Sequence, residues 1–381
     1  MTPSPNRRLR ALRLARTLLV LSLAFVLGSC DDSSSSSSGT PAVGTIKHVF
    51  VIVLENKGYD ETFGSGSVAT YLNGTLVPQG QLLREYHGIG HLSLTNYIAM
   101  VSGQAPNPST QADCTTYTDF VESGPVDADG QAVGTGCVYP ASIETIANQL
   151  EAHGYTWRAY EEDMGNSPTE PTTCRHPTIG QKDPTVSARL GDQYATRHNP
   201  FVYFHSVIDT PSCAANDVPL TGLEADLGSA ATTPNYVFIT PNLCNDGHDG
   251  PCVDGSPGGL VSADAFLAKW VPKILASPAY QDGGLLVITF DEAEFGGSSA
   301  DSSACCNEPT GPNTAAPGIV GEGGGRTGTL LISSHVAPGT TNDTPYNHYS
   351  FLRTVEDLFG LPYLGYAGQR GLKSFGSDVF R

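Results

Sequence analysis

Basic residues are scarce in this 381-residue chain, which has only 20 lysines and arginines against 38 aspartates and glutamates. The formal net charge is −18. Proteins that wrap nucleic acid need clustered Lys and Arg to neutralise phosphates, so no nucleic-acid partner is expected. The chain also lacks internal repeats and, after residue 45, any Ser- or Pro-rich linker. These absences favour one large domain over residues 45–381.

An apolar run long enough to span a bilayer is missing near the N-terminus, where residues 17–27 (TLLVLSLAFVL) give only 11 apolar positions. Five arginines precede this run, and small residues leading to Cys30 follow it. This pattern predicts a lipoprotein signal peptide at residues 1–29, with a lipid on Cys30. The Ser-rich stretch 30–44 would be a tether to the cell envelope. The alternative is an ordinary secretory signal and a secreted protein.

The nine cysteines are an odd number. If Cys30 carries lipid, eight remain, and an exported protein can keep them as up to four disulfides. Spacing does not select among the connectivities, although Cys244 and Cys252 bracket one short loop and are the simplest pair. No C-x-x-C pair is present and adjacent Cys305 and Cys306 chelate poorly, so structural zinc is disfavoured. The eight are Cys114, Cys137, Cys174, Cys213, Cys244, Cys252, Cys305 and Cys306.

Short, apolar, mostly non-alternating segments predict buried parallel strands. Amphipathic segments between them predict helices, one with Ser142 as a possible N-cap and one kinked at Pro272. We therefore expect an α/β fold with a largely parallel sheet flanked by helices on both faces, and long disulfide-pinned loops at 104–140 and 295–326. The strands are expected at 46–54, 236–240, 285–290 and 327–333, and the helices at 142–153, 262–277 and 351–359.

Polar residues follow three of these strands. Glu55 and Asn56 come after the first, Asp291 and Glu292 follow the segment 285–290, and residues 241–249 follow the remaining one. Because ligands bind beyond the carboxyl ends of parallel strands, the three groups should converge. Carboxylate and amide oxygens suit one divalent cation, with Ca²⁺ or Mg²⁺ favoured and Mn²⁺ or Zn²⁺ as alternatives. Taken singly, each pair is better explained as ordinary strand-end polar residues or helix caps, and it is the occurrence of three such groups that favours a metal site.

A short buried helix is expected over residues 93–103, with Ser93 or Thr95 at its start. A hydroxyl at a helix N-terminus sits in positive potential and suits a nucleophile that must hold a phosphate. The alternative is a plain helix cap. His348, just before the last apolar helix, could likewise bind a phosphate oxygen, donate a proton or serve as a cap.

Eight segments, in order, resemble the phosphoesterase family of acid phosphatases and bacterial phospholipase C enzymes, within the alkaline phosphatase superfamily. They are ENKGYDETFG (55–64), SLTNYIAMVSG (93–103), LEAHGYTWRAYEEDM (150–164), RHNPFVYF (197–204), TPNLCNDGHD (240–249), ITFDEAE (288–294), GGGR (323–326) and NHYSFLRTVEDLFGL (347–361). The resemblance spans residues 45–381 and implies an alkaline-phosphatase-like fold.

The resemblance also implies roles for single residues. A metal ion would be held by Glu55, Asn56, Asp291 and Glu292. Ser93 would be the nucleophile and Asn96 a donor to a non-bridging phosphate oxygen. His248 and His348 would contact the phosphoryl group or protonate the leaving group, and the further substrate-binding residues would be His91, Thr95 and Asn242.

Two departures from the family pattern matter. Thr95 replaces a proline common in relatives and leaves two hydroxyls near the helix start. Asn242 supplies no charge where two-metal relatives have an aspartate, so a single metal ion is expected.

The function implied is metal-dependent hydrolysis of small phosphate monoesters, with broad specificity, through a phosphoseryl intermediate. A phospholipase C-like phosphodiesterase is the first alternative, and a non-catalytic lipoprotein that binds phosphate or metal is the second. A sulfatase is disfavoured because the C-x-P-x-R motif is missing. The expected partners are the substrates and a membrane, through the lipid on Cys30, with no obligate protein partner.

Overall fold

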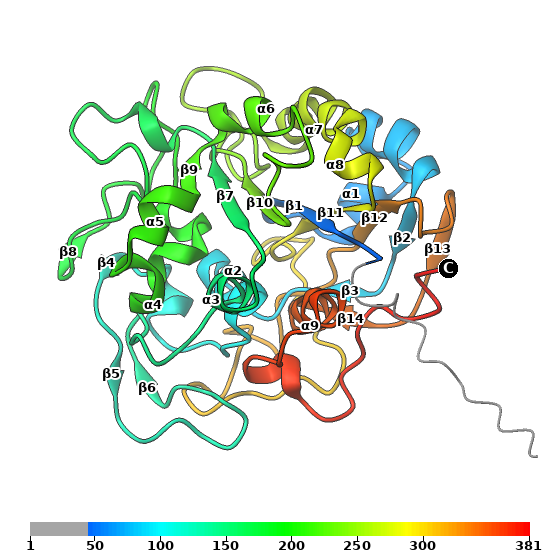
Figure 1. The fold of residues 1–381 in the computed structure, drawn as a ribbon. Helices are drawn as coiled ribbons and strands as arrows, with labels where there is room; N and C mark the ends of the chain where they lie inside the picture. Colours follow the sequence, from blue (N-terminus) through cyan, green and yellow to red (C-terminus); the bar gives the residue numbers. More distant parts are fainter. Residues whose placement is uncertain (1–44) are drawn as a thin grey trace, which may run out of the picture. The chain divides into compact units, whose positions relative to one another are not determined.

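A mixed eight-stranded sheet forms the centre of the computed structural model, which describes residues 45–381 (Figure 1). The predicted signal peptide and tether, residues 1–29 and 30–44, lie outside the described residues. The strands in spatial order are β13 (Thr340–Asn342), β2 (Gln81–Leu83), β12 (Thr329–Ser333), β11 (Gly284–Phe290), β1 (His48–Leu54), β10 (Tyr236–Thr240), β7 (Trp157–Glu161) and β9 (Asp217–Pro219).

Strand direction agrees largely with the prediction. β1 pairs in parallel with both β11 and β10, and the parallel arrangement continues through β7 to β9. β12 is antiparallel to both β11 and β2, so the strand predicted at 327–333 breaks the parallel run. The sheet is therefore mostly parallel, with an antiparallel element toward one edge.

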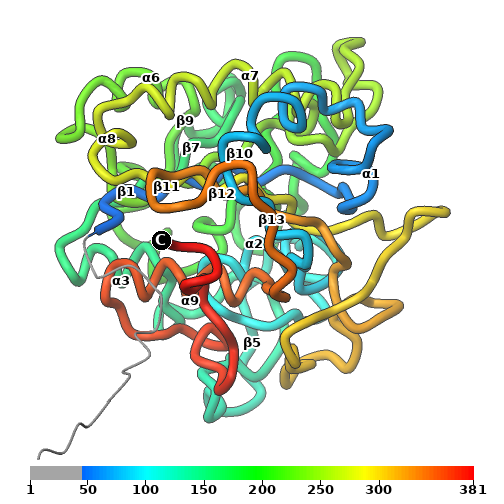
Figure 2. Tube along the Cα trace, turned by 90° about the vertical axis from the view of Figure 1, so that its right-hand side faces the viewer, coloured from blue at the N-terminus to red at the C-terminus, as the bar shows by residue number. Residues whose placement is uncertain are grey.

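Both faces of the sheet are covered because alternate residues of β1 enter two different cores. Val49, Val51 and Val53 pack in a core with residues of α2, α3 and α9. Phe50 and Ile52 pack in the other core, with residues of α6, α7 and α8. Figures 1 and 2 show these two helix groups on opposite sides of the sheet. The helices are α1 (Tyr59–Phe63), α2 (Ser93–Ser102), α3 (Ile146–Ala152), α4 (His205–Ile208), α5 (Pro211–Asn216), α6 (Leu223–Asp226), α7 (Gly259–Ala276), α8 (Pro278–Gln281) and α9 (His348–Phe359).

α2 begins at Ser93 as predicted, whereas three other helices begin at residues other than the predicted ones. α3 begins at Ile146, and its cap is Thr145, which exchanges hydrogen bonds with Asn148 in a capping box, so the Ser142 cap is wrong. α7 begins three residues earlier than predicted and continues through Pro272. α9 begins at His348 because the side chain of Asn347 accepts a hydrogen bond from the Ser350 amide.

Four disulfides are present among the described residues: Cys114–Cys137, Cys174–Cys213, Cys244–Cys252 and Cys305–Cys306. The predicted pairing of Cys244 with Cys252 is confirmed. The loop 104–140 is pinned by its own bridge, whereas the bond between Cys305 and Cys306 joins neighbours and ties the loop 295–326 to no other element. Within the described part of the chain, no helix is both long and apolar enough to cross a membrane.

Candidate active site

The segments after β1, β10 and β11 meet at one edge of the sheet, as predicted. β1 lies between the other two strands. The backbone amide of Glu55 donates to the carbonyl of Asp246 at 2.8 Å, and the amide of Asp291 donates to the carbonyl of Leu54 at 2.9 Å. The three polar groups therefore form one cluster, although they lie far apart in the sequence.

Ser93 is the first residue of α2 and faces this cluster. Its Oγ donates a hydrogen bond to Oε2 of Glu55 at 2.8 Å. Tyr97, one turn further along α2, donates its hydroxyl to the other oxygen of the same carboxylate. The hydroxyl of Thr95 instead donates to Thr110 Oγ1 at 3.4 Å. Of the two hydroxyls expected near the helix start, only that of Ser93 contacts a strand-end carboxylate.

Asn56 joins the groups that follow β1 and β11. Its amide N–H donates to Oδ1 of Asp291 at 3.0 Å, and its side-chain Nδ2 donates to Oε1 of Glu292 at 3.0 Å. Asn56 Oδ1 and Asp291 Oδ2 are both buried and have no hydrogen-bond partner in the described structure. Two orphaned buried oxygens beside further carboxylates are the donor set that a hard divalent cation prefers, so the residues fit such an ion.

The raised pKa values of these carboxylates also favour a bound cation. Burial, followed by the charges of Asp291 and Asp246, raises the pKa of Glu55 well above its usual value. Burial also raises the pKa of Asp291 to about 7. Clustered buried carboxylates resist joint ionisation, and a cation among them would offset this cost.

His198 and Asp246 also belong to the site. The sequence prediction did not include His198, and it included Asp246 only as one member of the polar group 241–249. The ring nitrogens of His198 lie 3.4 Å from Glu55 Oε2 and 3.2 Å from Asp246 Oδ2. Ligand atoms of these three residues all lie within 4.8 Å of one another, so they form a second group able to hold a metal ion. Burial, followed by the charges of Arg197 and His248, lowers the pKa of His198 well below its usual value, which keeps the ring neutral. No strand end or helix start marks His198; the only sequence signal was its place in the segment RHNPFVYF.

His248 is the most exposed of the predicted site histidines, with 37% of its side chain accessible. Its Nδ1 lies 2.8 Å from Asp249 Oδ1, and its Nε2 accepts a long hydrogen bond of 3.5 Å from Arg197 Nη2. Burial and the charge of Arg197 lower the pKa of His248. Since Nε2 accepts from the arginine, the proton of the neutral ring belongs on Nδ1, toward Asp249.

Two of the predicted site residues, His348 and Asn96, form hydrogen bonds with other parts of the protein. His348 is fully buried, with Nε2 2.6 Å from the carbonyl oxygen of Asp291 and Nδ1 3.0 Å from the hydroxyl of Tyr86. Asn96 accepts hydrogen bonds from the amides of Ile89 and Gly90 and donates to the Gly90 carbonyl. In this state both side chains position backbone that borders the site.

The last two predicted residues also have protein partners. His91 contacts Glu292 through Nδ1 and lies 3.1 Å from the carbonyl oxygen of Asp301 through Nε2. Asn242 donates to Asp163 and accepts from the amides of Cys244 and Asn245, so it shapes the loop after β10. The carboxylate of this loop that contacts the site is Asp246.

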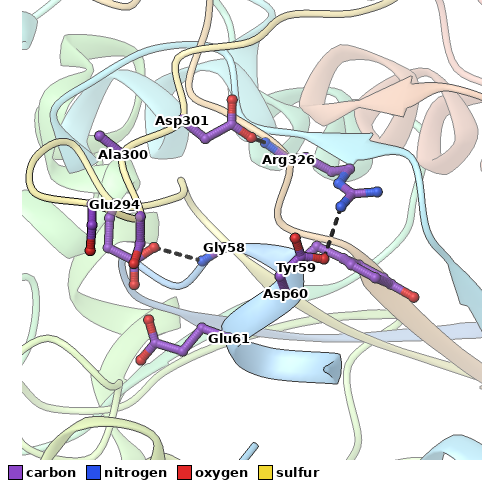
Figure 3. Close-up of a pocket in the computed structure, with 10 residues that line it drawn as sticks. Gly58, Tyr59, Asp60, Glu61, Glu294, Ala300, Asp301 and Arg326 are labelled. Atoms are coloured by element: carbon purple, nitrogen blue, oxygen red, sulfur yellow. Dashed lines mark hydrogen bonds and ion pairs between the residues drawn. The ribbon is translucent and has the colours of Figure 1, made fainter. Parts of the chain in front are cut away.

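A pocket of about 560 Å³ is lined by residues that come shortly after Asn56 and Glu292 in the sequence (Figure 3). Gly58 and Glu294 lie in its wall, and the Gly58 amide donates to Glu294 Oε2 at 3.3 Å. Arg326 is also in the wall but is held by Asp60 at 3.0 Å and by Glu85 at 3.0 Å. The further carboxylates of Glu61 and Asp301 make this pocket unsuitable for a phosphate group.

Residues 68–362 match the Phosphoesterase family over more than half of the chain. The chain belongs to the Phosphoesterase family. Ser93, Asp246 and Asp291 lie within the matched segment, whereas Glu55 and Asn56 precede it. By membership, the phosphoesterase described here is a hydrolase of phosphate esters.

Two relatives cover most of the phosphoesterase. A phosphatidylinositol-3-phosphatase of Mycobacterium tuberculosis is 26% identical over 362 residues, which are 95% of this chain and 92% of the relative. A probable acid phosphatase of Kluyveromyces lactis is 25% identical over 365 residues, covering 92% of this chain and 69% of the relative. Among solved structures, this chain is similar to an alkaline phosphatase superfamily protein of Vibrio parahaemolyticus. The sequence identity is 13%, the match covers 85% of this chain and 69% of that protein, and the TM-score is 0.47.

Proposed function

We propose that this phosphoesterase hydrolyses small phosphate monoesters by an acid-phosphatase-like reaction in which Ser93 forms a phosphoseryl intermediate. The observation that carries the proposal is the Ser93 hydroxyl at the N-terminus of α2, which lies 2.8 Å from Glu55 in the cluster that also holds the two orphaned oxygens of Asn56 and Asp291. Relatives named as acid phosphatases and as a phosphatidylinositol-3-phosphatase support a monoester substrate.

The metal ion belongs to this proposal. Glu55, Asn56, Asp291 and Glu292 would hold one divalent cation, Ca²⁺ or Mg²⁺ in preference to Mn²⁺ or Zn²⁺. When bound, such an ion neutralises charge on the transferring phosphoryl group and favours the ionised serine. The neighbouring group of Glu55, His198 and Asp246 is the alternative location for the ion.

The protein residues perform the rest of the reaction. Ser93 Oγ attacks phosphorus in line, and its proton has an acceptor in place at Glu55 Oε2. His248, the exposed histidine, would donate a proton to the departing alcohol oxygen from its doubly protonated form. His348 holds the backbone of Asp291 in position through its 2.6 Å contact. Water then cleaves the phosphoserine, and two in-line steps give overall retention at phosphorus.

Export also belongs to the proposal. The disulfides favour a compartment where such bonds persist. The lipid anchor on Cys30 would hold the enzyme at the cell envelope, with a secreted form as the alternative.

The test compares wild-type enzyme with two serine variants of the same helix. Ser93→Ala should abolish turnover of p-nitrophenyl phosphate while folding and metal content stay normal. Ser102→Ala should keep its activity, because Ser102 lies at the far end of α2 and bonds only to backbone there. Full activity in Ser93→Ala, with loss in Thr95→Ala, would move the nucleophile to Thr95. Turnover only of the bis-p-nitrophenyl ester or of phosphatidylcholine would replace the phosphatase with a phosphodiesterase.

Metal content locates the ion. EDTA should inactivate the enzyme, and readdition of Mg²⁺ or Ca²⁺ should restore it. Asp291→Asn should lose metal measured by elemental analysis, whereas Asp246→Asn should keep it. The reverse result would place the ion between Glu55, His198 and Asp246, and activity that resists EDTA would remove the metal from the reaction.

A further inference from the structure

Arg197 is a buried cation at the border of the proposed active site. It belongs to the short helix Thr196–His198, immediately before His198, and only 6% of its side chain is exposed. Its Nη1 donates to the carbonyl of Val186 at 3.3 Å and its Nη2 to His248 at 3.5 Å. The nearest carboxylate oxygen, on Asp113, lies 3.7 Å from Nε. A guanidinium has five N–H donors, so Arg197 keeps N–H groups for which these contacts provide no partner.

Other cations of the chain show how unusual this is. The equally buried Arg175 forms a two-pronged pair with Asp192 at 2.8 and 2.7 Å. Arg326 is held by Asp60 and Glu85, each at 3.0 Å, and Lys57 lies within 4.0 Å of Glu61 and Glu294. Among the described residues, Arg197 is thus a buried arginine beside the site that keeps N–H donors able to take an anion.

The contacts of Arg197 lead to Ser93 from two directions. Asp113, which faces its Nε, accepts a hydrogen bond of 3.1 Å from the amide of Leu94, the residue after Ser93. On the other side, the ring of His248 lies 6.1 Å from that of His198, and His198 lies 3.4 Å from Glu55 Oε2. Glu55 then accepts the hydrogen bond of Ser93. The guanidinium thus completes a ring of polar groups that begins and ends at the N-terminus of α2.

We propose that Arg197 binds the non-bridging oxygens of the phosphoryl group that Ser93 attacks, and that it gives the site its preference for dianionic monoesters. Asp113 is the positioning residue. It faces Nε and leaves the second N–H of each Nη group for the substrate. The inference rests on the proposed function, because the anion is the phosphate ester of that reaction.

The loop that carries Asp113 is restrained by a disulfide and by a backbone hydrogen bond. Asp113 and Cys114 both adopt left-handed backbone conformations, with φ of 50° and 48°, which non-glycine residues rarely adopt without support. The disulfide to Cys137 and the hydrogen bond from the Cys114 amide to the Ser109 carbonyl supply that support. The pinned loop 104–140 is thereby connected to substrate recognition.

The first test measures phosphate affinity and substrate preference. Arg197→Met should raise the KM for p-nitrophenyl phosphate and the Kd for inorganic phosphate, measured by calorimetry on metal-loaded protein, by about 10- to 100-fold. Its kcat/KM for the bis-p-nitrophenyl ester, which carries one charge fewer, should fall far less. Arg197→Lys should recover part of the phosphate affinity, because it keeps the charge but not the planar fork. Arg175→Met is the matched control: it should lower thermal stability and leave phosphate affinity unchanged.

The second test examines Asp113. Asp113→Asn should raise the KM about 3- to 10-fold in the wild-type background and have little further effect in Arg197→Met, as expected for residues that act through one another. Additive effects would overturn the positioning role. Unchanged phosphate affinity in folded, metal-loaded Arg197→Met, or equal losses for mono- and diester, would overturn the role of Arg197 while the phosphatase activity stood. If the wild-type enzyme hydrolysed no monoester, the proposed function would fail, and calorimetry with phosphate would still decide whether Arg197 binds the anion.

Discussion

At the scale of single residues, Glu55 connects more of the site than any other side chain described here. One carboxylate oxygen accepts from Tyr97, and the other accepts from Ser93 and lies close to His198. The residue is completely buried, and burial raises its pKa. A carboxylate in this position is costly for the fold, and it is explained if a cation and a nucleophile depend on it.

Glu55→Gln tests this dependence, because the amide keeps the shape and removes the charge. We expect kcat/KM for p-nitrophenyl phosphate to fall by about 100-fold or more and metal content to drop. Removal of an uncompensated buried charge should leave the thermal stability of metal-free protein equal or higher. Enzyme assays, elemental analysis and thermal melts measure the three quantities.

Asp264→Asn is the matched control, since Asp264 is also a buried carboxylate but accepts from the amides of Tyr71 and Leu72 and from the Thr70 hydroxyl. It should lower the melting temperature and leave metal content and kcat/KM intact. Normal metal content in Glu55→Gln would exclude Glu55 as a ligand.

At the scale of elements, the four predicted strands lie close to their expected positions, whereas only one of the four predicted helix starts, Ser93 in α2, does. The apolar runs at 46–54 and 285–290 coincide with strands. Both faces of the sheet are covered, so these strands are apolar at most positions and do not alternate between apolar and polar residues. Helix starts depend on side chains that compete for the same amides, and at α3 the pair Thr145 and Asn148 prevails over Ser142. Periodicity carries no information about that competition.

The site residues also divide into those that sequence patterns mark and those that only the folded structure brings together. Glu55 and Asp291 were found because they end strands, a position that sequence patterns mark. His198 and Arg197 sit on a short 3₁₀ helix between irregular segments, and only tertiary packing brings them beside Ser93. Asp246 was one of several polar residues after β10, and Asn242 takes the structural role in that loop.

The helix α9 carries a buried acid whose protonation should be visible in stability. Glu356 accepts a hydrogen bond from the Leu364 amide through Oε1, while Oε2 is buried without a partner in the described structure. Burial raises its pKa to about 9. A carboxyl whose pKa is raised on folding stabilises the fold when protonated, and this contribution is lost as pH rises from about 4.5 toward 9.

Glu356→Gln keeps the acceptor for Leu364 and cannot ionise. Wild-type and variant should therefore have similar stability at pH 4.5, and the variant should become the more stable by about 1 kcal/mol per pH unit as pH rises to 9. Chemical denaturation across this range measures the difference. A constant gap between the two proteins would mean that Glu356 does not bind a proton on folding.

At the scale of the whole molecule, the disulfides divide into those that restrain the fold and those that shape the site. Cys174–Cys213 closes a separation of 39 residues, and the Cys174 amide also donates to the Asp217 carbonyl at the edge of the sheet. Cys244–Cys252 closes only 8 residues, and these include Asp246 and His248. Chain entropy makes the longer loop worth more in stability, while the shorter one lies within the site.

Removing each bridge by paired alanine substitution should therefore separate stability from activity. Loss of Cys174–Cys213 should cost about 4 kcal/mol in urea denaturation, against about 2.5 kcal/mol for Cys244–Cys252. The order should reverse for kcat/KM measured well below the unfolding transition, because the loop carrying Asp246 and His248 loses its restraint only in the second variant. If the more destabilised variant were also the less active, the short bridge would serve the fold alone, and the geometry around Asp246 would be set by its hydrogen bonds to the Glu55 and His248 amides.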